Sequence, residues 1–182
     1  RYWDLPNNKI HISYNEAVEE TERLLRSSIK YRLLADLEVG VFLSGGIDSS
    51  LVSAIMQQES EKKIKTFSIG FGDKEYDESV YAKEVSRYIG SEHFEYKFNA
   101  TDVINLIDKL DYHFDEPSGN SASLPMMILS KMTKKEVTVA LSGDGADELF
   151  LGYERYFFMK DYLKKLTKIP QSLRTILSTI FK

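Results

Sequence analysis

The chain of 182 residues contains no cysteine, which excludes disulfide bonds, thiolate zinc sites and a cysteine nucleophile. Its three histidines, His11, His93 and His113, are scattered and do not have the spacing of metal ligands. No hydrophobic run is long enough to cross a membrane, and the first residues lack the pattern of a secretory signal peptide. We therefore expect a cytoplasmic protein with no membrane partner.

An excess of positive charge is also missing, since 24 lysines and arginines stand against 28 acidic residues. Proteins that bind nucleic acid through charge usually have a clear basic surplus, so we expect no nucleic-acid partner. The basic residues that remain gather in residues 160–182, which carry a net charge of +5. This tail fits either attachment to an anionic membrane or partner, or a helix pair whose apolar side packs on further chain. We favour the second interpretation.

Hydrophobic patterns of strand and helix alternate along the chain. Strands are expected over residues 39–43, 65–71, 93–98 and 137–141. Helices are expected over residues 14–35, 48–59, 77–88, 101–110 and 122–134. This alternation predicts an α/β fold with a doubly wound, mainly parallel sheet and helices on both faces. In such a sheet, ligands bind at the carboxyl ends of the strands.

Some details of the helices follow from single residues. Ser13 and Glu16 fit a capping box, Thr101 fits the cap of a later helix, and Gly90 is placed to end the helix over 77–88. Seven apolar side chains on the helices over 48–59 and 77–88 are expected to face inward: Leu51, Val52, Ile55, Met56, Val80, Tyr81 and Val85. The aromatic residues after Gly152 are expected to belong to the core: Tyr153, Tyr156, Phe157, Phe158 and Tyr162.

The first strand runs into the loop Ser44-Gly45-Gly46-Ile47-Asp48-Ser49-Ser50. Two glycines let the backbone turn tightly, and the amides and hydroxyls that follow form an anion site at the start of a helix. The loop is not a Walker A loop, because GxxxxGK[ST] occurs nowhere in the chain. Its carboxylate, Asp48, would repel a phosphate unless a divalent cation bridged the two groups, so the loop predicts Mg²⁺. The simpler alternative is a glycine turn followed by an ordinary acidic helix start.

This loop resembles the pyrophosphate-binding loop (PP-loop) of ATP pyrophosphatases, and further motifs resemble the asparagine synthetase family. These motifs are Thr66–Phe71 with Asp77-Glu78, Asp115-Glu116-Pro117, and Leu141–Phe150; Tyr2-Trp3-Asp4-Leu5 is similar to the family's interdomain segment. The resemblance implies the adenine nucleotide alpha-hydrolase-like fold. It also implies that residues 1–182 are the ATP-binding synthetase domain, truncated at its C-terminus and without the N-terminal glutaminase domain.

The resemblance implies an ATP-dependent carbon–nitrogen ligase. In that family the side-chain carboxylate of aspartate attacks the α-phosphorus of ATP, which gives β-aspartyl-AMP and pyrophosphate. Ammonia then attacks the acyl carbon, and asparagine and AMP leave. The implied cofactors are ATP and Mg²⁺. The implied partners are aspartate or a related carboxylate, ammonia, the glutaminase domain of the full-length protein and, as one assembly, a homodimer.

The resemblance also assigns roles to residues of this sequence. It implies these ATP-binding residues: Phe42, Ser44, Gly45, Gly46, Asp48, Ser49, Ser50, Ile69, Ser142 and Gly143. Asp48 and Asp147 would bind Mg²⁺, and Asp144 would lie beside the acyl-adenylate as the catalytic residue. Asp77 is a candidate for a further contact. The acids after Gly143 also fit a solvated turn before a helix, a role that we assign to Glu148.

Three positions depart from the family pattern. Leu151 stands where the fourth motif has glycine, and Asp144 stands where glutamate is common. No arginine precedes the helix that contains Pro125, and Ser121 holds the nearest position. Amidation of another carboxylate, as in β-lactam or cell-surface polysaccharide enzymes, therefore stays open. A different PP-loop ligase and a nucleotide-binding domain without activity are further alternatives.

Overall fold

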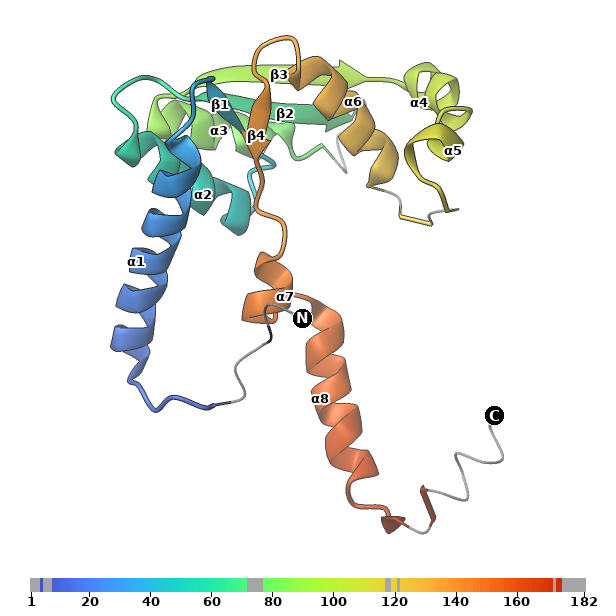
Figure 1. The fold of residues 1–182 in the computed structure, drawn as a ribbon. Coiled ribbons are helices and arrows are strands. Elements are labelled where there is room, and N and C mark those ends of the chain that lie inside the picture. Colours follow the sequence, from blue (N-terminus) through green and yellow to red (C-terminus); the bar gives the residue numbers. More distant parts are fainter. Residues whose placement is uncertain are drawn as a thin grey trace. The chain divides into compact units, whose positions relative to one another are not determined.

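Figure 1 shows the fold in a computed structural model, which describes residues 4, 8–71, 77–116, 119–120, 122–171 and 173–174. The chain divides into two compact units, Arg1–Gly143 and Asp144–Lys182. The first unit contains the sheet and most of the helices, and the described part of the second unit contains two principal helices.

Four parallel strands form the sheet of the first unit, in the order β3-β2-β1-β4. The strands are β1 (Val39–Phe42), β2 (Lys65–Phe71), β3 (Glu92–Phe98) and β4 (Val139–Leu141). Val41 of β1 pairs with Thr66 of β2 on one side and with Leu141 of β4 on the other. The carboxyl ends of these three strands therefore lie along one edge of the sheet, as the sequence predicted.

The helices of the first unit are α1 (Tyr14–Leu33), α2 (Ile47–Glu59), α3 (Ser79–Ile89), α4 (Ala100–Ile107), α5 (Leu110–His113) and α6 (Ser123–Thr133). The expected capping box is present at α1, because the Ser13 hydroxyl accepts from the Glu16 amide and the Glu16 carboxylate accepts from the Ser13 amide. The expected stop at Gly90 is also present, with the left-handed φ of 75° that favours glycine.

One expected cap was wrong. The cap of α4 is Asn99, whose side-chain oxygen accepts from the Asp102 amide at 3.1 Å while the Asp102 carboxylate accepts from the Asn99 amide at 3.0 Å. Thr101 lies inside the first turn, and the residue three positions after it, Ile104, cannot close a capping box. The single helix expected over 101–110 is instead two helices, α4 and α5.

Apolar clusters cover both faces of the sheet. On one face, Val39 and Val41 of β1 pack with Ile29 of α1 and with Ile55 and Met56 of α2. On the other face, the buried residues are Phe67 of β2, Leu129 of α6 and Val137, with Phe42 packed against them. Successive residues of a strand point to opposite faces, and Val41 and Phe42 belong to different clusters. This arrangement confirms the doubly wound α/β fold.

Three side chains that were expected inside are exposed: Leu51 by 45%, Val80 by 57% and Tyr81 by 61%. The buried residues of α3 are small ones, Ser79, Ala82 and Ser86. Small side chains let this helix lie close to the sheet, so its buried face carries little hydrophobic signal. Apolar periodicity therefore selected the wrong face of α3.

A chain of hydrogen bonds joins β2 and β3 to the end of α3. The Ser91 hydroxyl donates to the Ser86 carbonyl at 3.4 Å and lies 3.0 Å from Thr66 Oγ1. Thr66 Oγ1 lies 2.9 Å from His93 Nδ1, and Ser68 Oγ lies 3.2 Å from His93 Nε2. Because the carbonyl only accepts, the Ser91 hydroxyl donates to it, Thr66 donates to Ser91, and His93 Nδ1–H donates to Thr66. The network holds the His93 ring between Thr66 and Ser68.

This histidine should make stability depend on pH. Burial lowers the pKa of His93 below its usual value; the charge of Glu95 opposes the shift and that of Lys83 adds to it. The unfolded chain then binds the proton more readily, so stability is complete above about pH 6.5 and is lost as pH falls toward the folded pKa. Urea unfolding from pH 7 to about pH 5 should show a steeper loss for wild type than for His93→Gln. The exposed His11→Gln variant is the control and should keep the wild-type slope; equal slopes for wild type and His93→Gln would contradict the prediction.

Candidate active site

The loop over residues 44–50 joins the carboxyl end of β1 to the start of α2. Gly46 is the N-cap of α2, and no side chain caps this helix end. The first amides of an α-helix have no carbonyl within the helix to accept from them. The start of α2 therefore presents N–H donors and the positive end of the helix dipole, as an anion site requires.

Two serine hydroxyls close this loop on itself. Ser44 Oγ and Ser49 Oγ lie 2.9 Å apart, and Ser44 Oγ also accepts from the Gly46 amide at 3.2 Å. Ser49 Oγ accepts from the Ser44 amide at 3.2 Å and donates to the Gly46 carbonyl at 3.3 Å. Ser49 is buried, whereas Ser44 is exposed. Ser49 therefore shapes the loop, and its contact with pyrophosphate stays a prediction.

Ser50 and Asp48 are the remaining polar side chains of the loop. Ser50 Oγ is buried and has no hydrogen-bond partner among the described residues. An unsatisfied buried hydroxyl is costly and uncommon. Asp48 lies partly exposed in the first turn of α2. The spare hydroxyl and the uncapped helix start fit a phosphate group that would accept from both.

Gly45 brings the loop against α3. Its φ is 87°, and a side chain here would lie 2.5 Å from Tyr81 Cβ and 2.6 Å from the Ala82 amide nitrogen. Only glycine fits both the angle and the space. The contact between the first turn of α3 and this loop was not predicted from the sequence. The small residues Ser79 and Ala82 in that turn were the sequence feature that could have indicated this close contact.

Gly143 brings a second loop to the same place. It follows β4, and a Cβ at this position would lie 2.9 Å from the Ser49 amide nitrogen and 3.2 Å from Asp48 Cβ. The loop after β4 therefore packs directly on the first turn of α2. The structure thus brings together two segments that the sequence singled out: residues 44–50 and residues 142–143.

Phe42 and Ile69, the candidates for contact with adenine, pack against the same buried cluster near the ends of β1 and β2. Asp77 lies beside the carboxyl end of β2, because a Cβ on Gly70 would be 3.2 Å from Asp77 Oδ1. That oxygen accepts from the Ser79 amide at 3.0 Å and so supports the first turn of α3. Contacts of Phe42, Ile69 and Asp77 with a ligand stay predictions.

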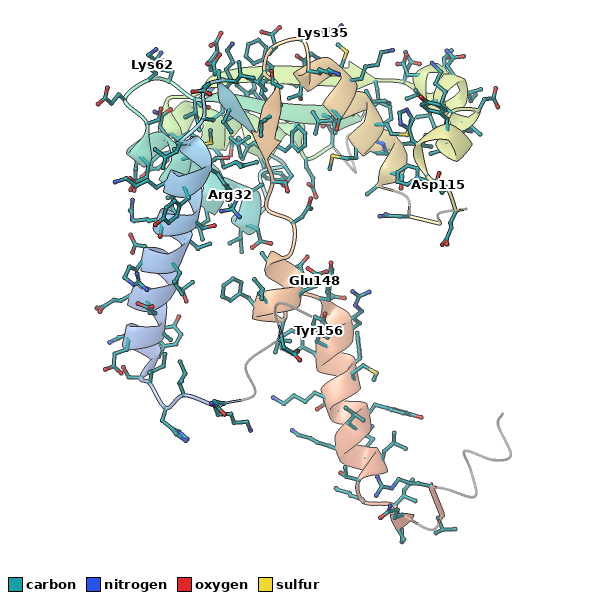
Figure 2. The ribbon with its side chains drawn as sticks, viewed as in Figure 1. Arg32, Lys62, Asp115, Lys135, Glu148 and Tyr156 are labelled. Carbon is teal, nitrogen blue, oxygen red and sulfur yellow. The ribbon has the colours of Figure 1, made fainter. Side chains whose placement is uncertain are left out.

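The second unit contains the other acidic candidates. Its helix α7 (Ala146–Phe150) starts after Gly145, with Asp147 and Glu148 in the first turn. The Tyr153 hydroxyl donates to Glu148 Oε1 at 2.7 Å, and this hydrogen bond lowers the pKa of Glu148. Glu148, labelled in Figure 2, is thus held inside its own unit.

The predicted Mg²⁺ ligands belong to different units, Asp48 to the first and Asp147 to the second. Within the described ranges, no three histidine or acidic side chains gather into a metal-binding group. An Mg²⁺ ion bound through one or two carboxylates and the phosphates of a nucleotide needs no such group. The pairing of Asp48 with Asp147 and the role of Asp144 stay predictions.

Leu151 has a φ of 59°, the one left-handed non-glycine residue among those the structure describes. It follows α7 at the position where the resemblance expects glycine, and its side chain is 58% exposed. Leu151→Gly should therefore raise the free energy of unfolding by about 0.5–1 kcal/mol. Glycine removes a backbone strain of about 1–2 kcal/mol, but it also raises the conformational entropy of the unfolded chain, which offsets part of the gain. Leu149→Gly, a change to an exposed helical leucine, should lower the free energy of unfolding by a similar amount. Chemical denaturation measures both, and destabilisation by Leu151→Gly would contradict the strain.

The aromatic residues of α8 (Glu154–Leu166) do not form the expected core. Phe157, Phe158 and Tyr162 are exposed by 65%, 73% and 61%. Their spacing is helical, as predicted, but the described part of this unit has too few elements to enclose both sides of α8. Tyr153 and Tyr156 are only partly buried.

Several residues singled out in the sequence lie outside the described part of the structure: Tyr2, Trp3, Leu5, Pro117 and Ser121. His113 ends α5, and its ring meets Tyr112 edge to face at 5.4 Å. No described helix is both long and apolar enough to span a bilayer.

Comparisons with known proteins agree with the motifs. The family model described as asparagine synthase matches residues 20–179. A putative glutamine-hydrolysing asparagine synthetase of Methanocaldococcus jannaschii is 42% identical over 178 residues, which are 96% of this chain and 34% of that protein. Asparagine synthetase 1 of Bacillus subtilis is 37% identical over 90% of this chain and 26% of its own length. The chain thus spans about a third or a quarter of these relatives.

Solved structures show the same fold at low sequence identity. The ADP complex of a glutamine-dependent NAD⁺ synthetase from Acinetobacter baumannii has a TM-score of 0.51 and 19% identity, over 82% of this chain and 29% of that one. The NH₃-dependent NAD synthetase of Campylobacter jejuni has a TM-score of 0.51 and 16% identity, over 74% and 60% of the two chains. At this identity the likeness concerns the fold alone, and it confirms the α/β fold class.

Proposed function

Because this chain belongs to the asparagine synthase family, we propose that it carries the ATP-using half of an amide-forming ligase. The proposed reaction activates the side-chain carboxylate of aspartate as β-aspartyl-AMP and then transfers it to ammonia. Aspartate is chosen over other carboxylates because the relatives at 37–42% identity are named asparagine synthetases. In the full-length protein, a glutaminase domain would supply the ammonia.

The main support is the shape of the loop over residues 44–50. An uncapped helix start, a buried hydroxyl without a partner at Ser50 and the close approach of Gly143 to the Ser49 amide all occur at one place. Backbone amides and hydroxyls in this arrangement would hold the β- and γ-phosphates, which leave together as pyrophosphate. The ADP in the Acinetobacter baumannii structure is consistent with nucleotide binding by this fold.

In-line attack at phosphorus depends mainly on positioning and on neutralising charge. The fixed loop would hold the leaving pyrophosphate opposite the incoming carboxylate oxygen. That oxygen forms a bond to the α-phosphorus while the bond to the bridging oxygen breaks. Ammonia then attacks the acyl carbon, AMP leaves, and the nitrogen loses a proton for which Asp144 is the proposed acceptor.

Asp48 and Asp147 would hold Mg²⁺, which supplies positive charge against the phosphates. Asp48 is suited to this role because it lies in the first turn of α2, next to the amides that would bind phosphate. Without a cation its carboxylate would repel the ligand. The sign of its effect on binding should therefore depend on Mg²⁺.

This dependence tests the proposed site. With Mg²⁺ present, Asp48→Ala should weaken ATP binding by about tenfold or more, whereas without Mg²⁺ the change should be small or favourable because a repulsive charge is gone. Asp48→Asn keeps the size of the side chain and should behave alike. Calorimetry with and without Mg²⁺ measures both affinities. Asp36→Ala, an exposed acid before β1, is the control; equal losses with and without Mg²⁺ for Asp48→Ala would contradict the bridge.

The acceptor is tested separately on the full-length protein. Pyrophosphate release and amide formation should both require aspartate when ATP, Mg²⁺ and ammonia are supplied. The same assay with other carboxylates in place of aspartate tests whether the protein amidates a different substrate. Amide formation on a different carboxylate would replace aspartate, and nucleotide binding without pyrophosphate release would point to a binding domain.

A further inference from the structure

A polar cavity of about 430 Å³ lies at the C-terminal end of α3. Lys83, Ser86 and Arg87 of α3 line it, together with Lys63 before β2 and Glu95 of β3. Lys63 precedes its strand, whereas the loop over 44–50 follows one. Since the strands are parallel, the cavity belongs to the opposite end of the sheet from the proposed nucleotide site.

The lining of this cavity has a surplus of positive charge. Lys83 and Arg87 are four residues apart on one helix, where like charges repel each other. Neither Lys63 nor Arg87 forms an ion pair with a residue that the structure describes. The carboxylate of Glu95 lies 3.8 Å from Lys83 Nζ and is shared with Lys97 at 3.5 Å. Three cations therefore face one carboxylate that already has partners.

Ser86 adds a hydrogen-bond donor to these charges. The residue lines the cavity and is 3% exposed. The negative end of a helix dipole opposes an anion. Here, however, the Ser86 carbonyl already accepts from the amides of Gly90 and Ser91 and from the Ser91 hydroxyl. These donors satisfy the Ser86 carbonyl at the end of α3.

We propose that this cavity binds a small phosphate-bearing anion through Lys63, Lys83, Arg87 and the Ser86 hydroxyl. The surplus of two positive charges in the lining matches a phosphate dianion, and a guanidinium suits two phosphate oxygens at once. The site does not depend on the proposed ligase activity.

Hydrogen exchange with mass spectrometry on the full-length protein tests this site, because it reports on each segment separately. The probes are glycerol 3-phosphate and inorganic phosphate, each compared with sodium chloride at equal ionic strength. Both probes should slow exchange in peptides that cover the end of α3 and the start of β3. Tighter binding of glycerol 3-phosphate would identify the ligand as a phosphomonoester, and tighter binding of inorganic phosphate would identify it as the free ion.

The variant Lys63→Gln/Arg87→Gln should lower the apparent affinity at this segment by about tenfold or more. Lys62→Gln removes a charge from the same connection between α2 and β2, labelled in Figure 2, but Lys62 does not line the cavity. The affinity of the Lys62→Gln variant for the phosphate probes should stay within about twofold of wild type. The three substituted residues, Lys62, Lys63 and Arg87, are all exposed, so the variants should fold. Slowing by chloride alone, slowing confined to residues 44–50, or unchanged affinity in the double variant would each overturn the proposal.

Discussion

Asp144→Ala in the full-length protein should slow ammonia-dependent amide formation by about 10²–10⁴-fold, the usual contribution of a positioned proton-transfer group. ATP affinity should change by less than about tenfold, because the proposed phosphate contacts come from the loop over 44–50 and not from this side chain. The expected loss follows from the proposed position of Asp144, between the carboxylate, the α-phosphate and ammonia. Asp144→Glu should recover part of the activity, since the same group returns on a longer side chain.

The assay measures amide and pyrophosphate together, so that it separates the two chemical steps. Pyrophosphate release without amide would place Asp144 after adenylation, and the loss of both products would place it before. Glu154→Ala, at the exposed start of α8, is the control for removing an acid from the same unit. Amide formation at the wild-type rate by Asp144→Ala would remove this residue from the mechanism.

Gly45→Ala should have the largest effect on the fold of the proposed site. The backbone here has a φ of 87°, and the added methyl group would lie 2.5 Å from Tyr81 Cβ. Left-handed strain of about 1–2 kcal/mol and overpacking of about 1–3 kcal/mol together predict a loss of stability of about 2–5 kcal/mol. Any protein that still folds should bind ATP at least about tenfold more weakly, because the loop must move away from α3.

Gly46→Ala is the matched control for stability, one residue further along the chain. Its φ of −68° suits any residue, and the nearest atom to an added Cβ is Ser44 Oγ at 3.3 Å, at the end of a short side chain. Its free energy of unfolding should stay within about 1 kcal/mol of wild type. Urea unfolding of both variants measures the difference. Equal stabilities for the two would show that neither the angle nor the contact with α3 matters.

Features set by neighbours in the sequence could be predicted. The capping box at Ser13, the stop at Gly90 and the strand over 65–71 depend on a few adjacent residues, and the structure has all three. The loop over 44–50 was predicted for the same reason, because its glycines and serines act within one turn. The loop after Leu141 was expected at the same edge of the sheet because the strands are parallel. Its close contact with the first turn of α2, through Gly143, appears only in the structure.

Features set by packing could not be predicted as well. The buried residues of α3 are Ser79, Ala82 and Ser86, whose small side chains allow close packing. Hydrophobic spacing therefore pointed to Val80 and Tyr81, which face outward. Which side of a helix is buried depends on what packs against it, and a single sequence contains that information only indirectly.

The position of β1 has a thermodynamic consequence for the proposed nucleotide site. This strand is paired on both sides, Val41 and Leu43 are 0% and 1% exposed, and the Leu43 amide donates to the Phe67 carbonyl at 2.8 Å. The loop therefore leaves the sheet from a rigid support, and Gly45 and Gly143 fix it against two further segments. Most of its conformational entropy is lost when the protein folds, so little remains to be lost when a ligand arrives. ATP should find a loop that is already in its bound shape.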